Sequence, residues 1–241
     1  MIWTLAFLLL LAIIGGDSPF MVKNLDKYVK KHVVDDTKKD KVLDYLKEAK
    51  AVRKKTVKAN KNLFKEFGKF EKSREATKED FETIGSKMME GQKISQSSNI
   101  KAIQNAQNYI TVDEWKAIQE EIDINFNKSS KKRKKNLAKL EKQFIKWEEK
   151  INNTIADNEK RKLAISAIER LKTTYINNKE QVQKELLNHN SIIYKYKASE
   201  PELKEVQEKY LKWAQEVFDV AIATHFELIE LTTPEEWKKI N

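Results

Sequence analysis

The sequence predicts an all-α fold: an elongated antiparallel helical bundle of two pseudo-repeated helical hairpins joined by a long central helix, with an N-terminal hydrophobic anchor segment. Three observations support this prediction. The 241 residues include only 5 Gly and 3 Pro, which are too few turn-forming residues for a sheet of many strands. Charged residues make up 35% of the chain, as in amphipathic helices, and helix-start signals recur along it.

The N-terminal segment is apolar. Residues 2–14 (IWTLAFLLLLAII) form a run of apolar or near-apolar positions with the length of a signal-peptide core. Extension to residue 22 reaches about the twenty residues that a bilayer span requires. Cleavage is disfavoured because the small residues Gly16 and Ser18 would place Pro19 directly after the cut. We therefore expect an uncleaved signal anchor over 1–22 that contacts the membrane through residues 2–22; the alternative is a buried N-terminal helix.

The charges around this segment leave its orientation open. No Lys or Arg precedes the apolar run, whereas Lys23, Lys27, Lys30 and Lys31 follow it closely. Taken literally, the positive-inside rule places the large domain in the cytoplasm. A true start a few residues upstream, with basic residues, would reverse this orientation. We expect a membrane-anchored protein with an extracytoplasmic domain, and the cytoplasmic side is the alternative.

A basic linker over 23–37 follows, and the helices beyond it are marked at their starts. In each case Ser or Thr is followed three residues later by an acid, a pattern that caps two backbone donors reciprocally. The six pairs are Thr37/Asp40, Thr77/Asp80, Thr111/Glu114, Thr154/Asp157, Ser199/Glu202 and Thr233/Glu236. With apolar residues at steps of three and four, they predict helices over 38–72, 78–107, 112–153, 155–193 and 200–231 and a turn over 234–240. The helix over 112–153 has a candidate break at 127–130.

Several of these features recur after 122 residues. The segments ITVDEWKAI (110–118) and TTPEEWKKI (232–240) align in that register without a gap, and so do apolar positions such as Ala49 and Leu171. We interpret the chain as two copies of a helical hairpin, over 38–118 and 154–241, joined by a central basic helix over 119–153. The alternative is chance similarity among helices rich in Lys and Glu.

The second helices of the two copies differ in side-chain size. In the 122-residue register, Gly91, Ser95 and Ser98 align with Trp213, Val217 and Val220. Because protein interiors fill to uniform density, we expect these two faces to pack together, small against large, across a pseudo-twofold axis.

The sequence contains no recognisable catalytic or metal-binding motif. There is no Cys, and His32, His189 and His225 lie far apart, outside the Glu-x-x-His pairs that build di-iron bundles. Neither a nucleophile turn nor a phosphate-binding glycine loop is present. The carboxylates alternate with Lys at the spacing of solvated pairs. We therefore expect no enzyme activity, no catalytic residue, no metal and no cofactor.

Two features are candidates for binding. A dense basic run comprises Lys128, Lys131, Lys132, Arg133, Lys134 and Lys135. It is either a site for the phosphates of nucleic acid or anionic lipid, or a solvated helix face or loop. Lys outnumbers Arg 42 to 5 in the chain, which disfavours nucleic acid because bidentate contacts use the Arg fork. The second candidate is the pair Trp115 and Trp237, which either display equivalent aromatic anchors for a partner or pack to close a helix start.

The paired Thr-x-x-Glu-Trp elements resemble the Leu-Thr-x-x-Gln motifs of small periplasmic helical stress chaperones, which are likewise basic, helical and exported. The resemblance covers only 110–118 and 231–240, and Glu114 and Glu236 stand where that family has Gln. We assign no family on this basis.

Taken together, these features predict a non-enzymatic, membrane-anchored helical binding or scaffold protein with a protein or peptide partner, such as an envelope chaperone-like or adaptor module. The alternative is a cytoplasm-facing basic module that binds anionic lipid or nucleic acid through the run at 128–135.

Overall fold

The structure is a computed structural model that describes residue 20 and residues 24–240; the side chains at 130–133, 183 and 186–190 lie outside the description. Within these limits every regular element is a helix, which confirms the all-α prediction. The helices are α2 (Leu25–His32), α3 (Asp36–Phe70), α4 (Lys78–Gln107), α5 (Val112–Thr154), α6 (Asn158–Ile193), α7 (Glu200–Leu231) and α8 (Pro234–Ile240). The short helix α2 falls in the segment that the sequence predicted as a linker.

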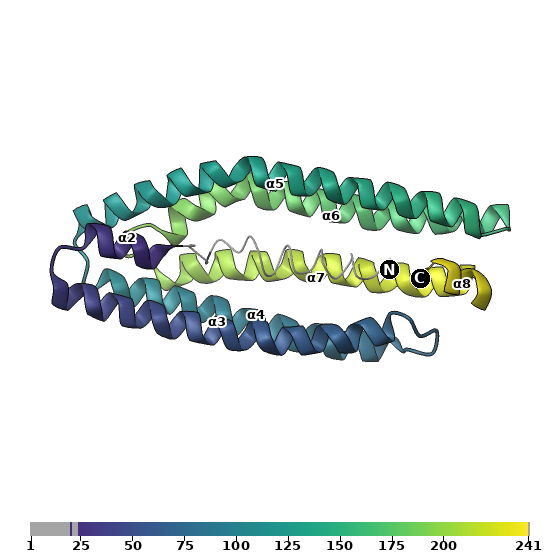
Figure 1. The fold of residues 1–241 in the computed structure, drawn as a ribbon, viewed down its shortest axis with the longest axis horizontal. Helices are drawn as coiled ribbons and strands as arrows, with labels where there is room; N and C mark the ends of the chain where they lie inside the picture. Colours follow the sequence, from purple (N-terminus) through teal and green to yellow (C-terminus); the bar gives the residue numbers. More distant parts are fainter. Residues whose placement is uncertain (1–19, 21–23, 241) are drawn as a thin grey trace.

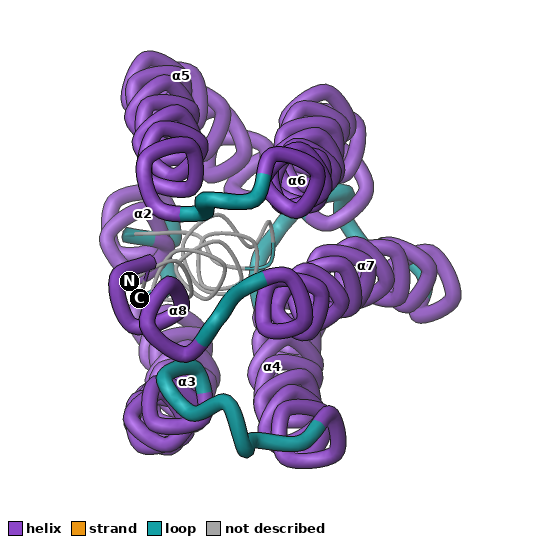
Figure 2. The backbone as a smooth tube through the Cα atoms, turned by 90° about the vertical axis from the view of Figure 1, so that its right-hand side faces the viewer, coloured by secondary structure: helices purple, strands orange, loops and turns teal. Residues whose placement is uncertain are grey.

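The helices form an elongated bundle. In Figure 1, α5 and α6 run side by side above α7, and α3 and α4 run side by side below it. The end view of Figure 2 shows the order α3, α4, α7, α6 and α5 around the long axis, with α2 and α8 on the side between α5 and α3. The helix α2 lies at one end of the bundle and α8 at the other (Figure 1).

Four of the six predicted helix-start signals are present as capping contacts. Thr77, Thr111 and Ser199 each accept a hydrogen bond from the backbone N–H three residues on, and the acid at that position accepts one in return. Thr233 and Glu236 form the same pair at the start of α8. Local side-chain chemistry therefore places these starts, because each pair satisfies two backbone donors that a helix leaves open.

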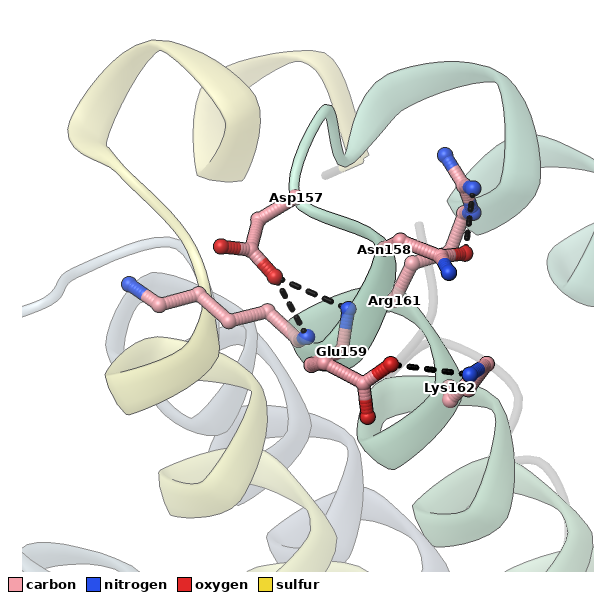
Figure 3. A network of polar contacts seen from close by, with 6 residues as sticks. Asp157, Asn158, Glu159, Arg161 and Lys162 are labelled. Atoms are coloured by element: carbon pink, nitrogen blue, oxygen red, sulfur yellow. Dashed lines mark hydrogen bonds and ion pairs between the residues drawn. The ribbon is translucent and has the colours of Figure 1, made fainter.

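The starts predicted at Thr37 and Thr154 are wrong. Asp35 caps α3 by accepting from the Lys38 N–H at 3.0 Å, so that Thr37 lies in the first turn. Thr154 is the last residue of α5, and α6 begins after Asp157. Figure 3 shows the Asp157 carboxylate accepting from the backbone N–H groups of Glu159 and Lys160, each at 2.9 Å. An aspartate carboxylate is favoured at this position because it accepts hydrogen bonds and opposes the positive end of the helix dipole.

Replacing these caps gives the first testable prediction. Asp35→Ala is expected to lower the free energy of unfolding by about 1 kcal/mol, the usual loss for an aspartate cap. The matched variant Thr37→Ala removes no cap and is expected to change stability by less than about half of that. Urea unfolding of both variants measures the difference. Equal losses would place the start of α3 at Thr37, as the sequence pattern alone suggested.

The long helix α5 is continuous from Val112 to Thr154. The candidate break at 127–130 is therefore wrong, because the backbone through the basic run is helical. The run has no Gly or Pro that would interrupt a helix.

The described hydrophobic core has two clusters along the long axis. One surrounds Phe81 of α4, Tyr175 of α6 and Phe218 of α7. The other surrounds Val29 of α2 and Trp115 of α5. Because α3, α4, α5, α6 and α7 contribute to both clusters, the same long helices pack the two ends of the molecule.

The prediction of a membrane-anchored protein is wrong for the part of the chain that the structure describes. No helix there combines the length and the apolar character that a bilayer crossing requires. Phe20, which the prediction placed inside the anchor, is only 1% exposed, and its ring packs edge to face on Tyr210 of α7. The rest of the predicted anchor, residues 2–19, 21 and 22, lies outside the described residues.

The helices α4 and α7 pack together, but the face predicted for α4 is wrong at Gly91. Gln207 of α7 donates to the Lys93 carbonyl and the Ser97 hydroxyl of α4. A Cβ added at Gly91 would instead meet Thr56 of α3, at 3.2 Å. Gly91 therefore faces α3, and the glycine opposite α7 is Gly85, which packs against the Phe218 ring.

Candidate functional site

The helices α2, α3 and α4 surround a pocket of about 590 Å³, a size typical of small-molecule sites. Its apolar lining consists of Phe20, Leu25, Leu43, Leu46, Ala49 and Ile103. The described charged residues of the lining are Lys27, Lys30, Lys47, Lys50, Arg53 and one acid, Asp26. Asn24 and Asn99 complete it. We call this cavity the basic pocket.

Helical periodicity brings these two kinds of residue together. Along α3, positions 46, 47, 50 and 53 each lie three or four residues from another position of the set 43, 46, 47, 50 and 53, so that these positions share one face of the helix. Lys27 and Lys30 are related in the same way on α2. Leu25 and Val29 are buried and hold α2 on the bundle. The side of α2 that carries Lys27 and Lys30 thereby reaches the pocket.

The cations of the basic pocket form no ion pair with a carboxylate among the described residues. Within the described residues, the ion pairs of the structure involve other lysines and arginines, such as Lys172 and Arg170. Arg53 is half-buried, and burial lowers the pKa of its guanidinium below the ordinary value, with no carboxylate acting in the other direction. A guanidinium stays charged at this pKa, so that the pocket contains a partly desolvated positive charge that an anion would stabilise.

The chain offers an internal comparison for this pocket. The residues 122 positions after Leu25, Ala49 and Arg53 are Trp147, Leu171 and Tyr175. These three side chains belong to one cluster of buried core residues. Leu25 and Ala49, which are smaller than Trp147 and Leu171, instead line the basic pocket.

The charges differ between the two places as well. The residues 122 positions after Lys27, Lys47 and Lys50 are Glu149, Glu169 and Lys172. Lys172 pairs with Glu148 and Glu169, at 3.2 Å to each. Although burial lowers the pKa of Lys172, the two carboxylates raise it above its ordinary value. The second half thus neutralises its lysine with its own acids, whereas the first half presents excess positive charge to the pocket.

The structure places both predicted tryptophans in the interior. The Trp115 Nε1–H donates to the Tyr194 carbonyl at 2.7 Å, and the Trp237 Nε1–H donates to the Lys72 carbonyl at 3.4 Å. Both indole rings are buried. These contacts agree with the alternative that such tryptophans pack at a helix start. A role in binding a partner stays a prediction.

The predicted basic run lies on α5, and none of the described residues of α5 lines the basic pocket. The backbone at Lys131, Lys132, Arg133, Lys134 and Lys135 is helical. The Lys134 and Lys135 side chains are exposed, and those at 131–133 lie outside the description. Binding of an anion by this run stays a prediction.

The two histidines whose side chains the structure describes, His32 and His225, lie on different helices. His32 lies on α2, with its Nε2 atom 3.5 Å from a Glu121 oxygen. His225 is a fully buried residue of α7. Among the described residues, no group of three or more His, Asp or Glu side chains is arranged to hold a metal ion. Burial lowers the pKa of His225 to about 4, so that its ring is neutral at pH 7.

Sequence reasoning missed the basic pocket because α2 was interpreted as a linker. The signal was available in the 122-residue register, where Ala49 aligns with Leu171 and Arg53 with Tyr175. A small residue and a cation that align with two large core residues indicate a position where the core is incompletely filled.

Comparisons of the chain with protein-family models, with curated proteins and with solved structures give no match.

Proposed function

We propose that this protein is a non-enzymatic helical binding protein whose basic pocket holds an anionic ligand. The observation that supports this proposal is Arg53, a half-buried guanidinium without a carboxylate partner in the described residues, in a pocket with four lysines and an apolar lining. The planar guanidinium matches the geometry of carboxylate and phosphate groups and forms charge-assisted hydrogen bonds with them. The lysines add the attraction that draws an anion into the site.

We further propose that the scaffold consists of two copies of one helical hairpin unit. Contacts that recur at a spacing of 122 residues support this proposal. Glu114 accepts a hydrogen bond from the Val34 N–H, and Glu236 accepts one from the Ala156 N–H, both at 2.9 Å. Each carboxylate thus joins the start of one helix to the loop that precedes α3 or α6.

The tryptophan contacts support the same proposal. Trp115, in the first copy, donates to a carbonyl in the loop between α6 and α7 of the second copy. Trp237, in the second copy, donates to a carbonyl just after α3 of the first copy. Tyr194 and Lys72, which provide these carbonyls, are also 122 residues apart. The two copies therefore hold each other at both ends, which keeps the pocket on a rigid frame.

The proposed anion binding is tested at Arg53 itself. We expect the NMR signal of the Arg53 Nε–H group to shift when the protein is titrated with carboxylate or phosphate compounds, both short and long-chained. Arg53→Gln is expected to weaken the affinity by about tenfold or more, the usual loss for a hydrogen bond to a charged group. Lys54→Gln, an exposed neighbour outside the pocket, is the matched control.

Two results would contradict the proposed function. One is an Arg53 signal that responds to none of these anions at low salt. The other is equal loss of affinity in Arg53→Gln and Lys54→Gln, because general attraction to a basic surface does not distinguish a pocket residue from its exposed neighbour.

A further inference from the structure

We infer that the ligand of the basic pocket is a single-chain amphiphile, with one apolar chain and a carboxylate or phosphate head. This inference rests on the proposed function and specifies the ligand. Two properties of the lining support it, namely the apolar area inside the pocket and the position of the cations around it.

The basic pocket has apolar surface that a site for an ion alone does not need. Leu43 and Leu46 are half-buried and keep free apolar surface, whereas Phe20, Leu25, Ala49 and Ile103 are each less than a tenth exposed and are already largely covered. A small hydrated anion makes no use of such a surface. An alkyl chain covers it, with a gain in affinity of about fourfold for each methylene group buried.

The cations are placed to hold the head of such a molecule. Lys27, Lys30, Lys47 and Lys50 are exposed, whereas Arg53 is half-buried. The charged ends of these side chains therefore lie between the apolar lining and the solvent. This is where the anionic head group would lie if the apolar chain of the amphiphile entered the pocket. Among the described residues of the lining, Asp26 is the one acid, and the five cations outnumber it.

The concave shape favours a single molecule over an extended surface. The basic pocket is lined by residues of three helices, and four of its six apolar residues are buried. A polyanion such as nucleic acid would reach the lysines but not the recessed side chains, and it would gain nothing from chain length. This difference separates the two kinds of ligand in solution.

The test is calorimetric titration of the full chain with monomeric amphiphiles below their micelle concentrations. One series contains acetate, octanoate, decanoate and dodecanoate, and a second contains inorganic phosphate and dodecyl phosphate. We expect the affinity to rise by about fourfold per methylene in the first series. We expect dodecanol, which lacks the anionic head, to bind at least about tenfold more weakly than dodecanoate. The tighter of the two dodecyl anions identifies the head as carboxylate or phosphate.

A variant that fills the pocket tests the location. Ala49→Leu introduces the side chain found 122 residues later, at Leu171, and is expected to reduce dodecanoate affinity by at least tenfold. Lys54→Gln is the control on the same helix and is expected to leave the affinity within about twofold of the wild type. If Ala49→Leu fails to fold, transfer of NMR magnetisation from the dodecanoate chain to the Leu43 and Leu46 methyl groups of the wild type tests the same location.

Several outcomes would overturn the inference. If acetate or inorganic phosphate shifts the Arg53 signal and binds as tightly as the dodecyl compounds, the pocket binds anions but not amphiphiles, and only this inference fails. If no anion of either series binds, the proposed function fails with it. Binding to anionic vesicles without binding to any monomeric amphiphile would instead indicate adsorption to a lipid surface.

Discussion

Gly85→Ala is expected to lower the free energy of unfolding by about 2 kcal/mol or more, although alanine normally stabilises a helix by up to about 1 kcal/mol relative to glycine. A Cβ at this position would lie 2.1 Å from Cζ and 2.3 Å from Cε1 of the Phe218 ring. That ring is buried in the core between α4 and α7. It has to leave its position, so that the gain in helix propensity is outweighed by the loss of packing.

The two other helical glycines that the structure describes provide the controls. At Gly68 the nearest neighbour of an added Cβ is a Glu71 oxygen at 4.0 Å, so Gly68→Ala is expected to stabilise the protein by about 0.5–1 kcal/mol. At Gly91 the Thr56 methyl lies at 3.2 Å, and we expect a change near zero because mild crowding opposes the helix gain. Urea unfolding of the three variants measures this order.

A second substitution identifies the cause of the loss. In the Gly85→Ala background, Phe218→Leu is expected to cost less than it does in the wild-type chain, because the ring no longer fits beside alanine. Equal costs in the two backgrounds, or a Gly85→Ala variant as stable as Gly68→Ala, would contradict the contact between Gly85 and Phe218.

The choice between Gly85 and Gly91 shows what the sequence predicts and what it does not. The 122-residue register predicted correctly that α4 packs on α7. Gly85 and Gly91 are six residues apart, which separates them by about 120° around a helix. The side of α4 that faces α7 follows from the packing of all the helices, and the register does not contain that information.

The helix starts were predictable to the extent that they depend on neighbouring residues. Four predicted caps accept a hydrogen bond from a backbone N–H of the first helical turn, and all four predictions are correct. They are Thr77, Thr111, Ser199 and Thr233. Thr37 and Thr154 match the same pattern, but an aspartate nearby makes the competing cap. Asp35 and Asp157 are 122 residues apart, whereas Thr37 and Thr154 are not, so the register itself distinguishes the correct caps.

The basic pocket was less predictable because it depends on what the helices leave unfilled. Leu25, Ala49 and Ile103 come from three different helices, and each looks like an ordinary core residue in its own segment. The space between them exists only after α2 packs on α3. The charge of the pocket was visible in the sequence as scattered lysines, and only the fold shows that five cations surround one cavity.

His225 is expected to make the protein less stable as the pH falls from about 6.5 toward about 4. Burial lowers the pKa of its imidazole to about 4 in the folded protein, whereas the unfolded chain has the ordinary value near 6.5. Below pH 6.5 the unfolded state therefore binds the proton more readily, and the folded state loses stability by up to about 1.4 kcal/mol per pH unit. Over the whole interval the loss amounts to about 3 kcal/mol.

The aromatic surroundings of His225 explain why the charged form is disfavoured. Its ring packs edge to face on Phe81, Phe226 and Trp237, with centroid distances of 4.7, 5.0 and 5.3 Å. These rings present little polar surface to an imidazolium. Glu202 is an example of a carboxylate whose pKa lies lower, because hydrogen bonds from Ser199 and Lys195 lower it to about 2. Such a group contributes stability that is lost only below about pH 4.5, so the interval from pH 6.5 to 5 reports on histidine.

The measurement compares urea unfolding of the wild type and His225→Leu at several pH values, because the difference cancels the titration of His32, His189 and the carboxylates. We expect the stability of the wild type relative to the variant to fall by about 1.4 kcal/mol for each unit between pH 6 and pH 4.5. A difference that stays constant over this range would mean that His225 is protonated equally well in both states. Burial among Phe81, Phe226 and Trp237 would then not disfavour the charged imidazole ring, which contradicts the expected result.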